Sequence, residues 1–203
     1  MANRGETAFD AGTRHYPPHS LLTYTGKIVT PFDMKPEMID IEDIARALSY
    51  IPRFLGHINI FYTVAQHCVE GALNIREHED GGDDPEYQLA FLLHDASEAY
   101  LCDIPSPLKR HPMFSAYRDA EDDLLERIFE KYGLGEWREY DHLRKRLKRV
   151  DTRMLSTEKR DIRKTRDHWP CEDDAPAYPR PLMAWRPDHV FGEYVAIFRG
   201  LRR

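Results

Sequence analysis

The chain has 203 residues, of which 41% are hydrophobic and 32% are charged, and its net charge is −6. This composition predicts a globular protein with one core, and the negative charge argues against a stable nucleic-acid partner. No stretch approaches the roughly 20 apolar residues that a membrane-spanning helix requires, and the first residues lack the apolar segment of a signal peptide. We therefore expect a cytoplasmic protein without membrane attachment, built as an arm at residues 1–39 and one compact domain at residues 40–203.

Residues 23–32 are rich in β-prone side chains, which predicts a short hairpin or an extended arm. From residue 40 onward the apolar periodicity is helical. Asp40 can cap a first helix, which Pro52 closes. A second helix ends before the acidic loop at residues 77–85, and its apolar stripe consists of Phe61, Val64, Ala65, Cys68 and Ala72. His67 lies beside this stripe and is expected to point toward the core.

Residues 87–101 are apolar on nearly every side, which is typical of a central helix. The few polar side chains of this segment cluster in one and a half turns, at His94, Asp95, Ser97 and Glu98. On one continuous helix, His94 and Glu98 would share a face because they are four residues apart. The cluster is therefore expected to form part of a functional site.

Two prolines, Pro105 and Pro107, follow this segment and predict an extended exit from it. The exit carries Asp103 and Lys109, and we expect it to form one wall of a site. The next predicted helix covers residues 114–132 and is stopped by glycines.

Residues 139–163 predict a long helix with its buried side at Leu143, Leu147, Val150 and Met154. Asp151 projects from an apolar flank of this helix and therefore needs a partner. The proline- and aromatic-rich segment at residues 168–187 predicts an ordered covering loop. Asp188 is expected to cap a final helix that runs to Leu201.

Two local features of composition also bear on function. Cys68, Cys102 and Cys171 are an odd number of cysteines at unrelated spacings, so we expect thiols rather than a disulfide framework or a zinc knuckle. Lys and Arg outnumber Asp and Glu at residues 138–166. This basic run is either the solvated face of a long helix or a basic rim that draws in phosphorylated substrates.

The pair His94-Asp95 is costly to bury in an apolar segment unless it is paired or bound to a metal. Because no cationic residue lies within several positions of Asp95, we expect a divalent cation as its partner. With His67 and Asp151, the pair supplies two imidazoles and two carboxylates from three predicted helices. This mixed nitrogen and oxygen set suits Mn²⁺, Co²⁺, Fe²⁺, Ni²⁺ or Zn²⁺.

The order of these residues resembles the H…HD…D signature of the HD-domain phosphohydrolases: His67, then His94-Asp95, then Asp151 within Arg149-Val150-Asp151-Thr152. Residues 94–98, HDASE, followed by residues 103–109, DIPSPLK, resemble the bacterial HD-type 5′-deoxynucleotidases and the related phage dATP triphosphohydrolases. The resemblance covers about residues 40–155. It implies an all-α HD-domain helical bundle with a short extended N-terminal arm, and a homodimer.

The resemblance also implies roles for further residues. Arg53 stands where the family places a phosphate-binding arginine, and Lys109 would offset phosphoryl charge beside it. Glu98 is expected to act as general base or acid for the attacking water, or else to orient a ligand histidine. Asp103 resembles the family's second acidic site residue, which contacts the sugar or the water, or it forms a turn. Dinuclear members carry more histidines, whereas only His111 follows closely here, so we expect one metal ion per chain.

These residues together predict hydrolysis of nucleotide phosphates, with 5′-dephosphorylation of deoxynucleoside monophosphates as the first reading. One alternative is a dNTP triphosphohydrolase, which needs extra cations such as Arg110 or residues of the basic run. Another alternative is a degenerate HD module that binds a nucleotide as a sensor. The presence of all four metal ligands and of Glu98 speaks against the degenerate module.

Overall fold

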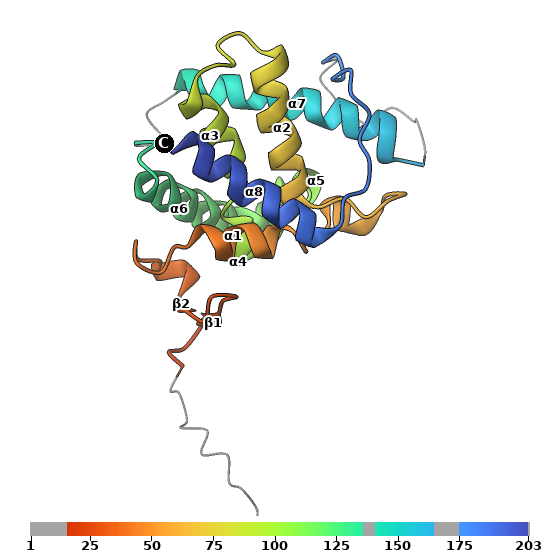
Figure 1. Ribbon diagram of the computed structural model, residues 1–203. Coiled ribbons are helices and arrows are strands. Elements are labelled where there is room, and N and C mark those ends of the chain that lie inside the picture. Colours follow the sequence, from red (N-terminus) through yellow and green to blue (C-terminus); the bar gives the residue numbers. More distant parts are fainter. Residues whose placement is uncertain (1–15, 136–140, 165–174, 203) are drawn as a thin grey trace, which may run out of the picture.

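The computed structural model describes residues 16–135, 141–164 and 175–202, and nearly all of their regular structure is helical (Figure 1). The α-helices are α1 (Ile41–Leu48), α2 (Val64–His78), α3 (Pro85–Leu93), α4 (Glu98–Leu101), α5 (Ser106–Lys109), α6 (Ser115–Lys131), α7 (Asp141–Ile162) and α8 (Pro187–Leu201). Three short 3-10 helices are η1 (Pro31–Asp33), η2 (Arg53–Gly56) and η3 (Pro112–Phe114). In these ranges no helix is long and apolar enough to cross a membrane. The all-α prediction is confirmed.

A short N-terminal hairpin is present, although its first strand precedes the predicted range of residues 23–32. Strand β1 (Leu21–Leu22) pairs antiparallel with β2 (Ile28–Val29). The hairpin is attached to the helical body because both the backbone N–H and the hydroxyl of Thr25 donate to the carboxylate of Asp43 on α1, over 2.6 and 2.8 Å. The hairpin therefore lies below α1 in Figure 1.

Helices α2, α3 and α8 pack against one another and form the centre of the core. Helix α7 crosses α2 and α3, α6 packs on α3, and α1 packs on α4 and α8 (Figure 1). Helix α3 is buried on nearly every side, as its sequence predicts, through Tyr87, Leu89, Ala90, Phe91, Leu92 and Leu93. The central position of α3 places the residues that follow it inside the molecule.

Local capping explains where the first helices begin. Asp40 caps α1 by accepting from the Glu42 N–H, as predicted. Thr63 caps α2 by accepting from the Gln66 N–H, so the second helix starts later than its apolar stripe predicts. Phe61 consequently lies outside the helix and is 46% exposed.

The prediction of one helix over residues 87–101 is wrong. Helix α3 ends at Leu93, residues 94–97 form a turn, and α4 is a separate short helix. In the turn, the Ala96 N–H donates to the Leu93 carbonyl and the Glu98 N–H to the Asp95 carbonyl, three residues back instead of four. His94 and Glu98 therefore do not share a helical face.

Two smaller predictions also need correction. The exit after α4 is extended only to Pro105, because α5 begins at Ser106 and holds Pro107 in its first turn, where a missing N–H costs nothing. Asp188 does not cap α8, since Arg186 occupies the N-cap position. Asp188 lies inside the first turn of α8 and pairs instead with Arg46, at 2.7 Å.

The described part of the predicted covering loop, residues 175–186, runs over α2 and α7. Tyr178 is fully buried, and its backbone N–H donates to the hydroxyl of Thr157 on α7 over 2.8 Å. The side-chain amide of Gln66 on α2 donates to the Met183 carbonyl over 2.7 Å. Residues 168–174, which include Cys171, lie outside the described residues, while Cys68 and Cys102 are free thiols as expected.

Gly71 allows α2 and α3 to approach closely, because a Cβ there would overlap the ring of Phe91. We predict that Gly71→Ala lowers the free energy of unfolding by about 1–3 kcal/mol, the usual cost of overpacking. Gly192→Ala on α8 is the matched control, because a Cβ there meets open space. This substitution should raise the free energy of unfolding by roughly 0.5–1 kcal/mol, since Ala favours a helix over Gly. Denaturant titration of both variants measures the difference; equal effects would contradict the close-packing argument.

Candidate metal centre

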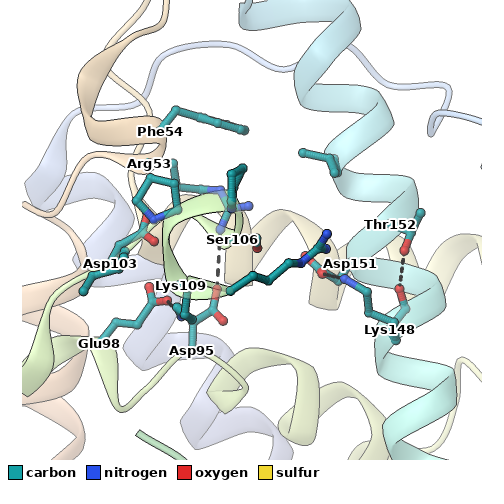
Figure 2. Close-up of a pocket in the computed structure, with 15 residues that line it drawn as sticks. Arg53, Phe54, Asp95, Glu98, Asp103, Ser106, Lys109, Lys148, Asp151 and Thr152 are labelled. Carbon is teal, nitrogen blue, oxygen red and sulfur yellow. Dashed lines mark hydrogen bonds and ion pairs between the residues drawn. The ribbon is translucent and has the colours of Figure 1, made fainter. Parts of the chain in front are cut away.

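One cavity of about 180 Å³ gathers most of the site residues that the sequence predicts. Figure 2 shows its lining, which includes Arg53, Asp95, Glu98, Asp103, Lys109 and Asp151. These residues come from η2, the turn after α3, α4, the following exit, α5 and α7. His67 is fully buried and does not belong to the lining. Its Nε2 atom lies within 4 Å of carboxylate oxygens of Asp95 and Asp151, which do line the cavity.

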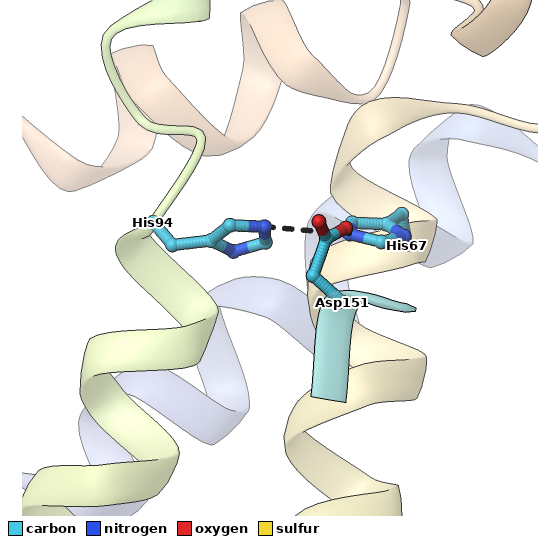
Figure 3. Close-up of side chains that lie close together, drawn as sticks. All are labelled: His67, His94 and Asp151. Carbon is cyan, nitrogen blue, oxygen red and sulfur yellow. Dashed lines mark hydrogen bonds and ion pairs between the residues drawn. The ribbon is translucent and has the colours of Figure 1, made fainter. Parts of the chain in front are cut away.

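The four predicted metal ligands converge on one point. The Nε2 atom of His67 on α2 lies 3.4 Å from Nε2 of His94 and 3.6 Å from Oδ1 of Asp151 on α7 (Figure 3). The same His67 Nε2 atom lies 3.9 Å from Oδ2 of Asp95. The Nε2 atom of His94 lies 3.3 Å from the other Asp95 oxygen.

The hydrogen bonds on the far side of each ring fix which nitrogen faces the centre. Nδ1 of His94 lies 2.6 Å from the Phe91 carbonyl, which can only accept a hydrogen bond. Nδ1 of His67 lies 2.7 Å from Oε1 of Glu158, a carboxylate. With both Nδ1 atoms donating, the Nε2 atoms face each other, and each can offer a lone pair to a cation. Two lone pairs and two carboxylates that face one point repel each other unless a cation lies between them.

The donor set fits a metal ion in type and spacing. Ligands at about 2.0–2.2 Å from one ion lie roughly 3–4 Å apart, which matches the separations of 3.3–3.9 Å here. His67, His94 and Asp151 form a group that could hold a metal ion, and Cys68 with His94 and Asp95 forms a second, overlapping one.

The protonation states also favour metal binding. Burial lowers the pKa of His94, which keeps the imidazole neutral. Burial alone would raise the pKa of Asp95, but neighbouring positive charge, including that of the Arg53 guanidinium, outweighs it and lowers the pKa. The pKa of Asp151 likewise falls below its usual range despite burial, chiefly because Lys148 is near. Lys148 Nζ lies 2.8 Å from Asp151 Oδ2.

Asp95 has a cationic neighbour that the local sequence does not reveal. Arg53 Nη1 lies 3.5 Å from Asp95 Oδ2, although the two residues are far apart in the chain. Arg53 also contacts both oxygens of the fully buried Glu158, at 3.2 and 3.3 Å. The expectation of a divalent cation for Asp95, drawn from the lack of cationic residues close to it in the sequence, is therefore incomplete.

Sequence reasoning missed Glu158, which connects the metal centre to the cavity. Its carboxylate accepts from both His67 and Arg53. One signal for it existed, because Glu158 follows Asp151 by two helical turns on α7 and so lies on the same face. Glu121 on α6 was missed too, and it pairs with Lys109 at 2.6 Å.

Glu98 and Asp103 lie in the cavity as acids with raised pKa values. Burial, followed by the charge of Asp95, raises the pKa of Glu98 well above its ordinary value. One carboxylate oxygen of Glu98 is buried without a hydrogen-bond partner among the described residues, and the other lies 3.5 Å from Lys109 Nζ. Burial also raises the pKa of Asp103.

A second cavity, of about 420 Å³, also borders the metal centre. Its lining consists of His94, Asp141, Arg144, Lys145, Leu147, Lys148 and Asp151. Asp151 and Lys148 line both cavities. The described start of the basic run thus reaches the metal centre instead of forming only a solvated face.

Comparison with known proteins yields two relatives. No family model matches the chain. The uncharacterized protein YfdR of Escherichia coli is 34% identical over 183 residues, which cover 89% of this chain and 94% of YfdR. An uncharacterized protein of Rhodobacter capsulatus is 31% identical over 115 residues, covering 54% of this chain and 56% of that protein. Neither relative carries a stated activity.

We predict that Glu158→Gln weakens metal binding by about 10–100-fold, the usual effect of removing the partner of a ligand histidine. The amide also removes the negative charge of Glu158 from Arg53, which then keeps Asp95 as an acidic neighbour. Glu79→Gln is the control, because Glu79 is another buried carboxylate and pairs with Arg153 and Tyr178 away from the centre. Competition against a chelating dye measures the metal Kd, and equal losses in both variants would contradict a specific role for Glu158.

Proposed function

This chain belongs to the YfdR family, and we propose that it is a metal-dependent phosphohydrolase that removes the 5′-phosphate from deoxynucleoside monophosphates. The observation that carries the proposal is the convergence of two imidazole Nε2 atoms and two carboxylates on the wall of a cavity that also contains the cationic side chains of Arg53 and Lys109. The resemblance of the His67, His94-Asp95 and Asp151 motif to HD-domain phosphohydrolases supports the same class of reaction. The ion would be a single Mn²⁺, Co²⁺, Fe²⁺, Ni²⁺ or Zn²⁺ per chain.

The cations of the cavity suit the recognition of a phosphate group. Arg53 is held from behind by Glu158, which preorganises its guanidinium for a phosphoryl oxygen. Lys109 lies between Glu98 and Glu121, and these carboxylates raise its pKa although burial opposes them. A divalent ion held by the four donors would polarise a phosphoryl oxygen and lower the pKa of water.

Glu98 is the side chain best suited to move protons in this reaction. Its pKa is raised from that of an ordinary carboxyl group, in the direction of neutral pH. General acid–base catalysis is most efficient when the pKa of the catalytic group lies near the operating pH. As water attacks phosphorus and the bond to the 5′-oxygen breaks, Glu98 would take a proton from the water and return it to the leaving oxygen. The products are inorganic phosphate and a nucleoside. Asp103, on the same cavity, would contact the sugar or the water.

We predict that Glu98→Gln retains the metal and still binds nucleotide but lowers kcat by roughly a hundredfold or more, the scale of a lost general base. Glu70→Gln is a matched control, since Glu70 is a buried carboxylate that pairs with Arg180 outside the cavity. Metal analysis and steady-state kinetics of both variants make the test. Loss of the metal from Glu98→Gln would instead place Glu98 among the ligands.

The second cavity favours one alternative, a dNTP triphosphohydrolase. Arg144, Lys145 and Lys148 line it directly beside the metal centre, where the outer phosphates of a triphosphate could extend. Two of these cations already have acidic partners, since Lys145 pairs with Asp141 and Lys148 with Asp151. We therefore keep the monophosphate as the first proposal.

The test is a panel of deoxynucleoside mono-, di- and triphosphates, each assayed with several divalent metals. We predict a higher kcat/KM for monophosphates, because Arg53, Lys109 and one metal neutralise a single phosphate better than three. Arg53→Ala should cost about 3–4 kcal/mol of transition-state stabilisation, the scale of a lost preorganised contact to the reacting charge.

A variant of the second cavity separates the two proposals. Lys145→Ala should leave kcat/KM for monophosphates unchanged, because the monophosphate would not reach this cavity. Release of inorganic triphosphate from dNTPs that depends on Lys145, with monophosphates inert, would reject the nucleotidase and favour the triphosphohydrolase. No turnover of any nucleotide with any metal would reject both.

A further inference from the structure

The break between α3 and α4 leaves the Leu92 carbonyl without its helical partner. In a continuous helix, the Leu92 carbonyl would accept from the N–H of Ala96, four residues later. The Ala96 N–H donates instead to the Leu93 carbonyl, over 2.9 Å. Because Leu92 is fully buried, water cannot replace the lost bond, and an orphaned carbonyl there would be costly.

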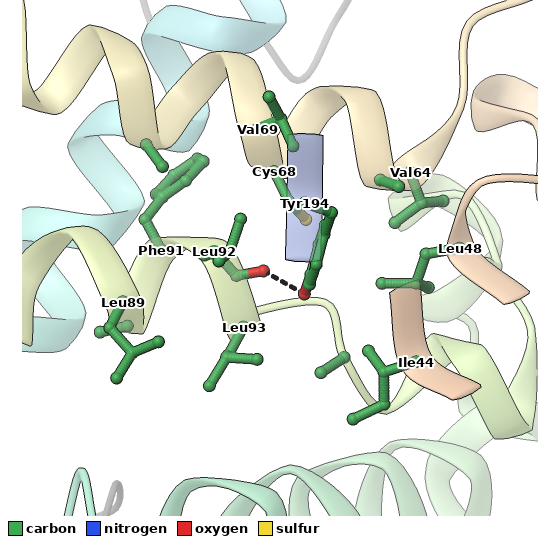
Figure 4. Packing of buried hydrophobic residues seen from close by; sticks show 14 of the residues in the cluster. Ile44, Leu48, Val64, Cys68, Val69, Leu89, Phe91, Leu92, Leu93 and Tyr194 are labelled. Atoms are coloured by element: carbon green, nitrogen blue, oxygen red, sulfur yellow. Dashed lines mark hydrogen bonds between the residues drawn. The ribbon is translucent and has the colours of Figure 1, made fainter. Parts of the chain in front are cut away.

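Tyr194 of α8 supplies the missing donor. Its hydroxyl donates to the Leu92 carbonyl over 2.5 Å (Figure 4). Tyr194 is itself fully buried, so the bond lies inside the core between α3 and α8. The chain thus satisfies the broken end of α3 with a side chain from its last helix.

The broken helix brings His94 and Asp95 to the same point. On an α-helix, consecutive side chains point about 100° apart, whereas here Nε2 of His94 lies 3.3 Å from Oδ1 of Asp95. The turn also keeps the Phe91 carbonyl within reach of His94 Nδ1. Re-forming a regular helix over residues 92–98 would therefore separate the two ligands.

We infer that Tyr194 is a positioning residue for the metal centre, whose hydroxyl stabilises the turn that presents His94 and Asp95. The inference rests on the metal site of the proposed function and concerns no contact between Tyr194 and substrate. The bond to the Leu92 carbonyl offsets the loss of the helical bond and so favours the turn over a continuous helix. Helix α8 thereby takes part in the site without reaching the cavity.

The test is Tyr194→Phe, which removes the hydroxyl and keeps the packing ring. In the metal-free protein, the amides of residues 92–98 should exchange with deuterium several-fold to about tenfold faster, since a buried hydrogen bond is lost. The Kd for Mn²⁺ or Zn²⁺, measured against a chelating dye, should rise by about tenfold or more. Wild-type values for both measurements in a folded variant would overturn the inference.

Tyr178→Phe is the matched control. It also removes the hydroxyl of a fully buried tyrosine, but this hydroxyl donates to Glu79 over 2.7 Å, outside the metal centre. We expect a lower melting temperature with unchanged metal Kd and unchanged exchange at residues 92–98. An equal rise of the metal Kd in both variants would reduce Tyr194 to general stabilisation. If wild-type protein binds no divalent metal, the proposed function fails, while the exchange measurement still decides the role of Tyr194 in the turn.

Discussion

The structure depends on one electrostatic constraint, the placement of two imidazole lone pairs and two carboxylates around a single point inside the helical body. Such an arrangement is unfavourable without a cation, so the surrounding fold must hold it together. Three features of the packing do this. Gly71 lets α3 approach α2, the turn after α3 redirects His94 and Asp95, and α7 carries Asp151 across both helices. The chemistry of the site is thus tied to how closely the helices pack.

Buried carboxylates around this centre pair with a candidate metal ligand and with cations of the cavity. The Glu158 carboxylate accepts hydrogen bonds from Nδ1 of His67 and from the guanidinium of Arg53. A candidate metal ligand and a candidate phosphate-binding group therefore share one carboxylate. Lys109, on α5, lies between Glu98 and Glu121. Arg53 and Lys109 are therefore both oriented by carboxylates before any substrate arrives. This preorganisation suits a reaction in which negative charge develops on phosphoryl oxygens.

The segment at residues 175–186 and the buried Glu79 fix α7 in its place. Glu79, at the end of α2, pairs with Arg149 and Arg153 of α7 and accepts from the hydroxyl of Tyr178. These contacts join α7 to the end of α2, away from the metal centre. Helix α7 also carries Asp151 and Glu158, so the site draws on segments that lie far apart in the chain.

Sequence alone determined the helical class and, by resemblance, the candidate ligands and cavity residues, because apolar periodicity and an unusual His-Asp pair are local signals. It also located α1, α6, α7 and the hairpin closely. It could not show that residues 87–101 break into two helices, since each residue there suits a continuous helix and the buried Tyr194, which offers the Leu92 carbonyl another donor, comes from the distant α8. Glu158 and Glu121 were missed for a related reason: an acidic residue on a charged helix is expected to face solvent, and its buried partners come from distant segments. The tertiary structure decided these points because packing sets the hydrogen-bond and charge partners in a core. Packing brings together residues that are distant in the sequence, so no local stretch predicts these partners.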